Sequence, residues 1–252
     1  MAEEVELTLR VASQDPEGLF RDITARPSLG RTILVPRGVG SMHDRYFDTP
    51  DSSLMKGGYA LRLRTKGGRT LLALKGREKR DEQGGISRLE IEGPWARETI
   101  SRVDRELGTA LGQAFDPGDP AGSLRAMGFV PIQSRETTRT LLDVVSGPGS
   151  EPVCELALDR VRYEAAGKAY LHYEVEIELK AHGRQGLLQG MRDCLRQAYP
   201  GALEPWDYNK LVTGFALEAL IRQGEPDPGD GVIPPSWYDK MAVWIRERRT
   251  CA

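Results

Sequence analysis

Short segments in which apolar and charged residues alternate recur along this chain. In the first, EVELTLR (residues 4–10), Val5, Leu7 and Leu9 are separated by charged or polar residues. A period of two is typical of a half-buried β-strand, because successive side chains leave opposite faces of the pleat. The alternation returns in ALRLR (60–64), RLEIEG (88–93) and EVEIELK (174–180). The recurrence therefore predicts a sheet with one apolar and one charged face.

The charges on the second face are grouped by sign. Acidic residues recur within single strands, at Glu4 and Glu6, at Glu90 and Glu92, and at Glu174, Glu176 and Glu178. Basic residues form a second group, made of Arg62, Arg64, Lys75 and Arg139. On an open sheet, like charges placed opposite one another gain nothing and repel modestly. In a sheet closed into a barrel with this face inside, the same charges would line a binding cavity.

The remaining patterns complete an α+β chain. Strands are expected at 31–38, 42–49, 59–66, 69–76, 86–93, 137–145, 152–163 and 169–180. Helices are expected at 15–25, 96–115, 187–195 and 207–222, and a last one carries Trp237, Met241, Trp244 and Ile245 on one face. Residues 1–222 are thus predicted to form one domain. The Pro/Gly linker and C-terminal helix of residues 223–252 would pack on that domain or on a partner subunit.

Charge balance, cysteine spacing and the lack of long apolar runs limit the expected partners and location of the protein. The 35 basic and 37 acidic residues nearly cancel, so nucleic acid is not favoured as a ligand. Cys154, Cys194 and Cys251 form no CxxC pair, and the N-terminus has no apolar signal region. No run approaches the roughly 18 apolar residues of a membrane helix. We expect a cytoplasmic protein without disulfides or a membrane partner, and a homodimer is left open.

The charged face suits one kind of chemistry. Arg and Lys side chains match the closely spaced oxygens of a polyphosphate, and Arg can do so with two parallel hydrogen bonds. Carboxylates can hold Mg²⁺ or Mn²⁺, which prefer oxygen ligands and can bridge a carboxylate and a phosphate. Phosphoryl transfer needs mainly positioning and charge neutralisation, so the lack of an evident nucleophile motif is no obstacle.

Seven segments, in chain order, resemble the CYTH-domain proteins, the triphosphate tunnel metalloenzymes. They are EVE (4–6), YFDTPD (46–51), ALRLR (60–64), LALKG (72–76), RLEIEGP (88–94), CELALDR (154–160) and EVEIELK (174–180). The resemblance covers about residues 3–217. It implies an eight-stranded antiparallel β-barrel, with helices packed outside, that binds a small-molecule triphosphate. It also implies an enzyme that hydrolyses inorganic triphosphate or a related short polyphosphate with Mg²⁺ or Mn²⁺.

The resemblance also implies roles for individual residues. Substrate binding falls on Arg62, Arg64, Lys75, Arg88, Arg139 and Lys210, with Arg10 as an addition. Metal binding falls on Glu4, Glu6, Glu90, Glu92, Glu176 and Glu178, with Glu174 less clear. Glu176, Glu178 and Lys75 are the expected catalytic residues.

Two positions depart from the family pattern. The N-terminal ExExK signature falls on Glu4, Glu6 and Thr8, so its lysine is absent. Arg10 lies on the same strand face but about 6.5–7 Å further along, which makes full replacement unfavourable. Asn209 stands before Lys210 where the family usually has serine. An adenylyl cyclase, a nucleoside or thiamine triphosphatase, and a non-catalytic polyphosphate-binding module therefore remain as alternatives.

Other conspicuous residues are expected to have structural roles. Asp48 precedes a Pro-containing turn and is predicted to bind local backbone groups. Cys154 alternates onto the apolar face and is predicted to be a small core residue. His43, His172 and His182 have no metal-ligand spacing, and none is expected to be catalytic.

Overall fold

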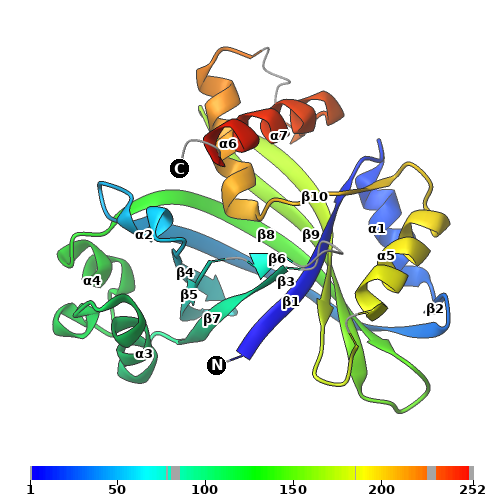
Figure 1. Ribbon diagram of the computed structural model, residues 1–252, viewed down its shortest axis with the longest axis horizontal. Coiled ribbons are helices and arrows are strands. Elements are labelled where there is room, and N and C mark those ends of the chain that lie inside the picture. The colour runs from blue at the N-terminus through cyan, green and yellow to red at the C-terminus, as the bar shows by residue number, and fades with distance from the viewer. Residues whose placement is uncertain (1, 78, 81–85, 185, 226–230, 250–252) are drawn as a thin grey trace. The chain divides into compact units, whose positions relative to one another are not determined.

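The computed structural model describes residues 2–77, 79–80, 86–184, 186–225 and 231–249 (Figure 1). Its long strands are β1 (Ala2–Val11), β3 (Thr32–Asp48), β4 (Ala60–Lys66), β5 (Arg69–Lys75), β7 (Ile86–Pro94), β8 (Val130–Val145), β9 (Pro152–Ala165) and β10 (Lys168–Leu179). Its short strands are β2 (Ser28–Leu29), β6 (Lys79–Arg80), β11 (Leu203–Pro205) and β12 (Gly231–Val232). Its helices are α1 (Pro16–Ala25), α2 (Ser53–Lys56), α3 (Arg97–Leu107), the 3-10 helix η1 (Leu111–Ala114), α4 (Pro120–Ala126), α5 (Gly186–Ala198), α6 (Lys210–Arg222) and α7 (Pro235–Arg249).

The strands belong to one sheet with the order β11-β1-β10-β9-β8-β3-β4-β5-β7-β6. The eight long strands are consecutive neighbours in this order, and β1 has an additional pairing with β7. Registers are antiparallel for β1 with β10, β10 with β9, β3 with β4, β4 with β5, and β5 with β7. The predicted α+β class, with an antiparallel sheet and helices packed outside it, is confirmed.

Two compact units make up the chain. Unit 1 consists of Met1–Glu4, Ser41–Lys79 and Ser87–Glu136, and unit 2 consists of Val5–Gly40, Arg80–Ile86 and Thr137–Ala252.

No helix of the described residues is long and apolar enough to cross a membrane.

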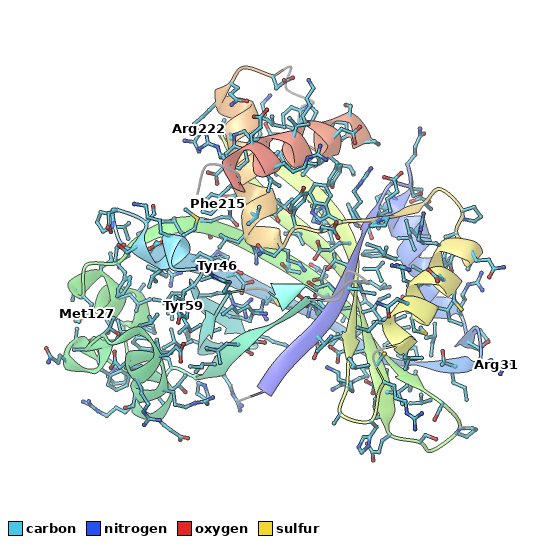
Figure 2. All side chains as sticks on the ribbon, in the orientation of Figure 1. Arg31, Tyr46, Tyr59, Met127, Phe215 and Arg222 are labelled. Carbon is cyan, nitrogen blue, oxygen red and sulfur yellow. The ribbon has the colours of Figure 1, made fainter. Side chains whose placement is uncertain are left out.

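The core of unit 1 forms on one face of β4, β5 and β7. The buried side chains there are Leu61, Leu63, Leu72, Leu74 and Ile91, joined by Ile100 and Val103 of α3 and Leu124 of α4. Tyr59 and Met127, labelled in Figure 2, pack against the same cluster. Since neighbouring residues of a strand point to opposite faces, Arg62 and Arg64 lie on the other face of β4.

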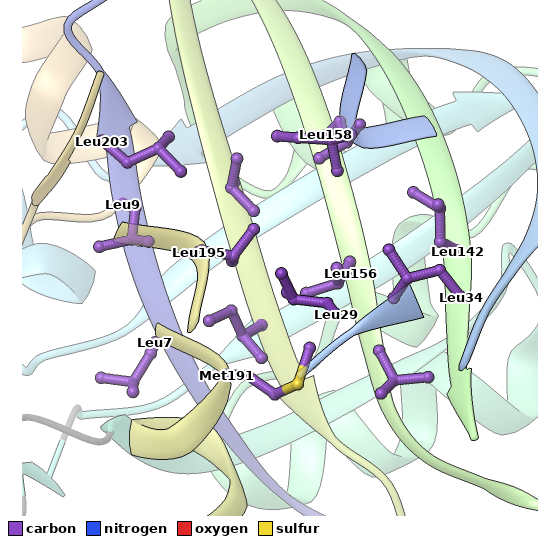
Figure 3. Close-up of a cluster of buried hydrophobic side chains, with 14 of the residues drawn as sticks. Leu7, Leu9, Leu29, Leu34, Leu142, Leu156, Leu158, Met191, Leu195 and Leu203 are labelled. Carbon is purple, nitrogen blue, oxygen red and sulfur yellow. The ribbon is translucent and has the colours of Figure 1, made fainter. Parts of the chain in front are cut away.

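The larger core of unit 2 lies between its strands and helices α1 and α5. Figure 3 shows Met191 and Leu195 of α5 beside Leu7 and Leu9 of β1. Cys154 is buried in this cluster, as predicted. Helix α1 begins where expected, because the Asp15 carboxylate accepts the Gly18 N–H at 2.8 Å.

A second apolar cluster of unit 2 holds the C-terminal helix. Trp237, Met241 and Ile245 of α7 pack with Leu217 of α6 and Tyr170 of β10. Figure 1 shows α7, in red, lying across α6, in orange. The last helix is therefore packed within its own chain.

Two expected boundaries were wrong. Residues 31–38 and 42–49 were expected to form two strands, but the structure has a single strand there, β3. Gly38 lies within this strand with a φ of 122°, a backbone conformation that favours glycine. The expected helix 96–115 stops at Leu107, because Gly108 has a left-handed φ of 65°. Asp104 then accepts the Leu111 and Gly112 N–H groups, at 2.6 and 3.0 Å, and caps η1.

Candidate functional site

The face of unit 2 opposite α1 and α5 is polar. Across β1 and β10, Thr8 pairs with Glu176 and Arg10 with Glu174, while Glu6 pairs with Glu178. On the next strand, Asp159 pairs with Glu174 and Glu155 with Glu178. The alternation read from the sequence thus places Glu6, Glu176 and Glu178 on one face of the sheet, together with two acidic residues of β9.

Three of these carboxylates form a compact acidic cluster. Oxygen atoms of Asp159, Glu174 and Glu176 all lie within 4.8 Å of one another. Asp159 and Glu174 are buried, whereas Glu176 is only partly buried. Three carboxylates this close repel one another strongly in a buried setting, so the cluster requires cations.

Arg139 supplies the first cation from β8. Its Nε and Nη2 atoms lie 2.7 and 2.5 Å from the two carboxylate oxygens of Asp159, and Nη2 also contacts Glu176. Burial would lower the pKa of Arg139, but the charges of Asp159 and Glu176 raise it well above its usual value. Arg139 is therefore a permanent cation.

Lys210 supplies the second cation as the first residue of α6. Its Nζ atom lies 3.0 Å from Asp159 and 2.5 Å from Glu176, and it also contacts Glu174. Asn209 caps the helix by accepting the Val212 N–H at 3.0 Å, which is the backbone role a serine there could also fill. Burial would lower the pKa of Lys210, but Glu174, Glu176 and Asp159 raise it.

The donor set of the acidic cluster fits a hard divalent cation. Carboxylate oxygens are the ligands that Mg²⁺ and Mn²⁺ prefer, and three converge here. The cluster carries three negative charges against two positive ones, so it retains one uncompensated charge. Lys210 contacts all three carboxylates, so a metal ion would share them with its ammonium group.

The other acidic residues of this face lie apart from the cluster. Glu178 is 2.9 Å from Lys180 Nζ, which is also 3.4 Å from Glu155. Glu6 is buried and sits beside Glu178 in the register. Within the described chain, Glu6 and Glu178 do not belong to the group of three converging carboxylates.

Arg10 is directed to a different set of partners. Its guanidinium pairs with Glu204 of β11 and lies 4.6 Å from the centre of the Tyr238 ring. In the strand register, Arg10 of β1 lies opposite Glu174 of β10. The side-chain contacts found for Arg10 among the described residues are instead with β11 and α7.

Unit 1 contains a second charged group, centred on Asp44. Arg64 Nε and Nη2 lie 2.7 and 2.9 Å from the Asp44 oxygens, and Arg62 and Arg135 approach to 3.6 Å. Arg135 also donates to the hydroxyl of Tyr46, labelled in Figure 2. Burial would raise the pKa of Asp44, but Arg62 and Arg64 lower it well below its usual range.

The remaining predicted residues of unit 1 form ion pairs. Arg62 Nη2 lies 2.8 Å from Glu92, and Lys75 Nζ lies 3.1 Å from Glu90. The side chains of Glu4 and Arg88 lie outside the described part of the structure. Asp48 accepts the Leu54 and Met55 N–H groups at 2.9 and 3.0 Å, which confirms its predicted backbone role.

Four charged residues of these two groups were not among the predicted sites or were only weakly indicated. They are Asp44, Arg135, Asp159 and Glu174. The alternation placed Glu174 on the charged face as a less clear metal ligand, and Asp159 continues the polar positions of its strand in the same way. Asp44 and Arg135 carry no comparable signal, since their contact joins β3 to β8 across a long stretch of sequence.

Comparison with known proteins places the chain in a family. Residues 36–205 match the CYTH domain. No curated protein sequence matches the chain. Among solved structures, it is similar to HpAC1 from Hippeastrum, reported as an adenylyl cyclase candidate with a dominant triphosphatase activity. The TM-score is 0.53 at 20% identity, over 89% of this chain and 98% of that one.

A second similar structure is the PH1819 protein from Pyrococcus horikoshii OT3. Its TM-score is 0.50 at 20% identity, over 86% of this chain and 99% of that one. At this identity both structures support the fold, and the domain match covers more than half of the sequence. The chain belongs to the CYTH domain family.

Proposed function

We propose that this protein hydrolyses inorganic triphosphate, or a related short polyphosphate, in a reaction that depends on Mg²⁺ or Mn²⁺. The observation that carries the proposal is the interleaving of Arg139 and Lys210 with Asp159, Glu174 and Glu176. Buried cations and carboxylates in one place suit a substrate that is itself an anion carrying a metal ion. The triphosphatase activity named for the Hippeastrum protein is consistent with this chemistry.

Each group has a role in the proposed reaction. Arg139 presents its guanidinium fork, and Lys210 its ammonium group, to phosphate oxygens. The three carboxylates would hold the metal ion, which would neutralise charge on the phosphate chain. The Arg139 and Glu176 side chains keep 18% and 16% of their exposure, so both can reach substrate and water.

Glu176 is the carboxylate best suited to orient the attacking water, because it is the most exposed of the three. Water adds to the terminal phosphorus, the bridging P–O bond breaks, and triphosphate yields diphosphate and phosphate. No covalent intermediate with the protein is required. Lys75 and the Arg62–Arg64 pair of unit 1 remain proposed phosphate-binding residues.

The test is phosphate release from triphosphate, ATP and thiamine triphosphate, each with Mg²⁺, with Mn²⁺ and with a chelator. We expect the highest kcat/KM for triphosphate and no release with the chelator. Cyclic AMP should also be measured, because the Hippeastrum protein is named for an adenylyl cyclase activity. Preferred conversion of ATP to cyclic AMP would favour a cyclase, and triphosphate binding without turnover would favour a binding module.

A further inference from the structure

His172 and Tyr238 form a hydrogen-bonded chain that ends on the acidic cluster. His172 Nε2 lies 2.6 Å from Glu174 Oε2, and His172 Nδ1 lies 2.7 Å from the Tyr238 hydroxyl. All three side chains are at most 2% exposed. Tyr238 belongs to α7, outside residues 36–205 that match the CYTH domain.

The order of donors along this chain follows from the carboxylate, which can only accept a hydrogen bond. His172 Nε2 therefore donates to Glu174, and His172 Nδ1 accepts from the Tyr238 hydroxyl. Burial raises the pKa of Tyr238, in keeping with a hydroxyl that acts as the donor. Glu174 accepts at Oε2, while its other oxygen contacts Lys210. The carboxylate is thus held from two sides.

Both supports of Glu174 depend on the α6–α7 pair. Lys210 begins α6, and Tyr163 of β9 donates to its carbonyl oxygen at 2.7 Å. Trp237, Met241 and Ile245 anchor α7 in the apolar cluster that includes α6. Arg10 lies over the Tyr238 ring and fixes the ring from the β1 side.

We propose that His172 and Tyr238 are positioning residues that orient the Glu174 carboxylate for metal binding, and that α7 is thereby part of the site. The inference rests on the metal site of the proposed function, but not on which triphosphate is cleaved. Hydrogen bonds to ligand carboxylates fix their orientation, and losing such partners typically costs about 10- to 100-fold in metal affinity or activity.

The test compares two buried tyrosines of unit 2. Tyr238→Phe keeps the ring and removes the hydroxyl that faces His172. Tyr173→Phe is the matched control, because its hydroxyl is also removed from a buried ring but contacts Glu17 and Arg160 at 2.7 and 3.2 Å. The readouts are the Kd for Mn²⁺ without substrate, the melting temperature, and kcat and KM for triphosphate.

We expect Tyr238→Phe to weaken Mn²⁺ binding by about tenfold or more, with Tyr173→Phe unchanged. In turnover, kcat should fall while KM for triphosphate stays the same, because Arg139 is untouched. His172→Leu should weaken Mn²⁺ binding further. His172→Gln should recover part of the loss, since its amide can still donate near the position of Nε2.

Equal Mn²⁺ affinities for Tyr238→Phe and Tyr173→Phe would overturn the inference, and so would a wild-type chain that binds no Mn²⁺. Should His172→Leu fail to fold, the tyrosine pair decides the question alone. A wild-type protein that binds Mn²⁺ but cleaves no triphosphate would contradict the proposed function. The Mn²⁺ comparison would still decide the role of His172 and Tyr238.

Discussion

The Nζ atom of Lys210 lies 3.0 Å from a carboxylate oxygen of Asp159. The same ammonium group contacts Glu174 and Glu176, so one lysine at the start of a helix serves three carboxylates of the sheet. The ammonium group offsets part of the negative charge that the buried acids of β9 and β10 bring together. It also means that Lys210 and a metal ion draw on the same oxygens.

Replacing Lys210 by Met should therefore tighten Mn²⁺ binding when triphosphate is absent. Removal of one positive charge should raise the affinity by about tenfold or more, which corresponds to about 1.4 kcal/mol. The metal-free variant should be less stable by about 3–5 kcal/mol, because a buried ion pair is broken. Isothermal titration with Mn²⁺ and thermal unfolding with and without Mn²⁺ measure both effects.

Lys240→Met is the control for Lys210→Met, because Lys240 of α7 is a more exposed lysine that pairs with Glu225. It should leave Mn²⁺ affinity unchanged. Weaker Mn²⁺ binding in Lys210→Met than in this control would show that Lys210 supports the metal site instead of competing with it.

Arg139→Ala should weaken the binding of triphosphate by about 1.5–3 kcal/mol, the usual scale for hydrogen bonds to a charged group. Arg139→Lys should recover only part of this loss, because an ammonium group lacks the fork that fits two oxygens. Titration with triphosphate in the absence of metal measures the affinity. Arg160→Ala is the control on β9, since Arg160 pairs with Glu17 away from the cluster. Equal losses in the two alanine variants would rule out a specific phosphate contact for Arg139.

Asp44→Asn should reveal a pH-dependent contribution to stability. The pKa of folded Asp44 lies below its unfolded value of about 3.9, so its charge stabilises the fold above that pH. This contribution is lost as the pH falls through the folded pKa. At pH 7 the substitution should cost about 3–5 kcal/mol, and the cost should shrink by about 1.4 kcal/mol per pH unit below pH 4.

Urea unfolding at pH 7, 4 and 3 checks this expectation. Asp22→Asn, at an exposed position of α1, should have little effect at any of these pH values. A cost of Asp44→Asn that is the same at pH 7 and pH 3 would mean that the charge of Asp44 does not stabilise the arginine group.

Thr8→Lys restores the basic residue that the family signature carries. Thr8 pairs with Glu176 across β1 and β10, so a lysine there would lie beside the cluster. We predict a gain of about five- to thirty-fold in kcat/KM for triphosphate, equivalent to about one to two kcal/mol. Arg10→Ala and the double variant complete the measurement. A rate unaffected by Thr8→Lys but lost in Arg10→Ala would show that Arg10 has taken over the role.

The alternation of the strands made the two faces of the sheet predictable. It placed Leu7 and Leu9 in the core and Thr8 on the polar face with Glu176, as the register of β1 and β10 has them. Lys210 was predicted as a substrate-binding residue from its resemblance to a family segment, and the structure brings it to the acidic cluster. Asn209 before it caps the helix, a backbone role that serine could also fill. Local pattern was informative in these cases because it fixes which face of a strand a residue occupies and where a helix begins, although the contacts of Lys210 still join α6 to β9 and β10.

Residues whose roles depend on distant elements could not be predicted in the same way. The Tyr238–His172 contact joins a helix beyond a Pro/Gly linker to a strand, and no period in either segment encodes it. Asp44 was missed because its partner Arg135 comes from β8. The apolar stripe of α7 predicted that this helix packs, but its docking surface is set by the tertiary fold.

The central measurement is metal-dependent phosphate release from triphosphate by wild type, Glu176→Gln and Glu164→Gln. Glu164 is an exposed residue of β9 paired with Arg162, so its variant controls for loss of a carboxylate. We predict that Glu176→Gln abolishes turnover with Mg²⁺ and Mn²⁺ while metal-free triphosphate binding is unchanged or tighter, and that Glu164→Gln matches wild type. Full turnover in Glu176→Gln, or no metal-dependent turnover in wild type, would contradict the assignment of this cluster as the catalytic centre.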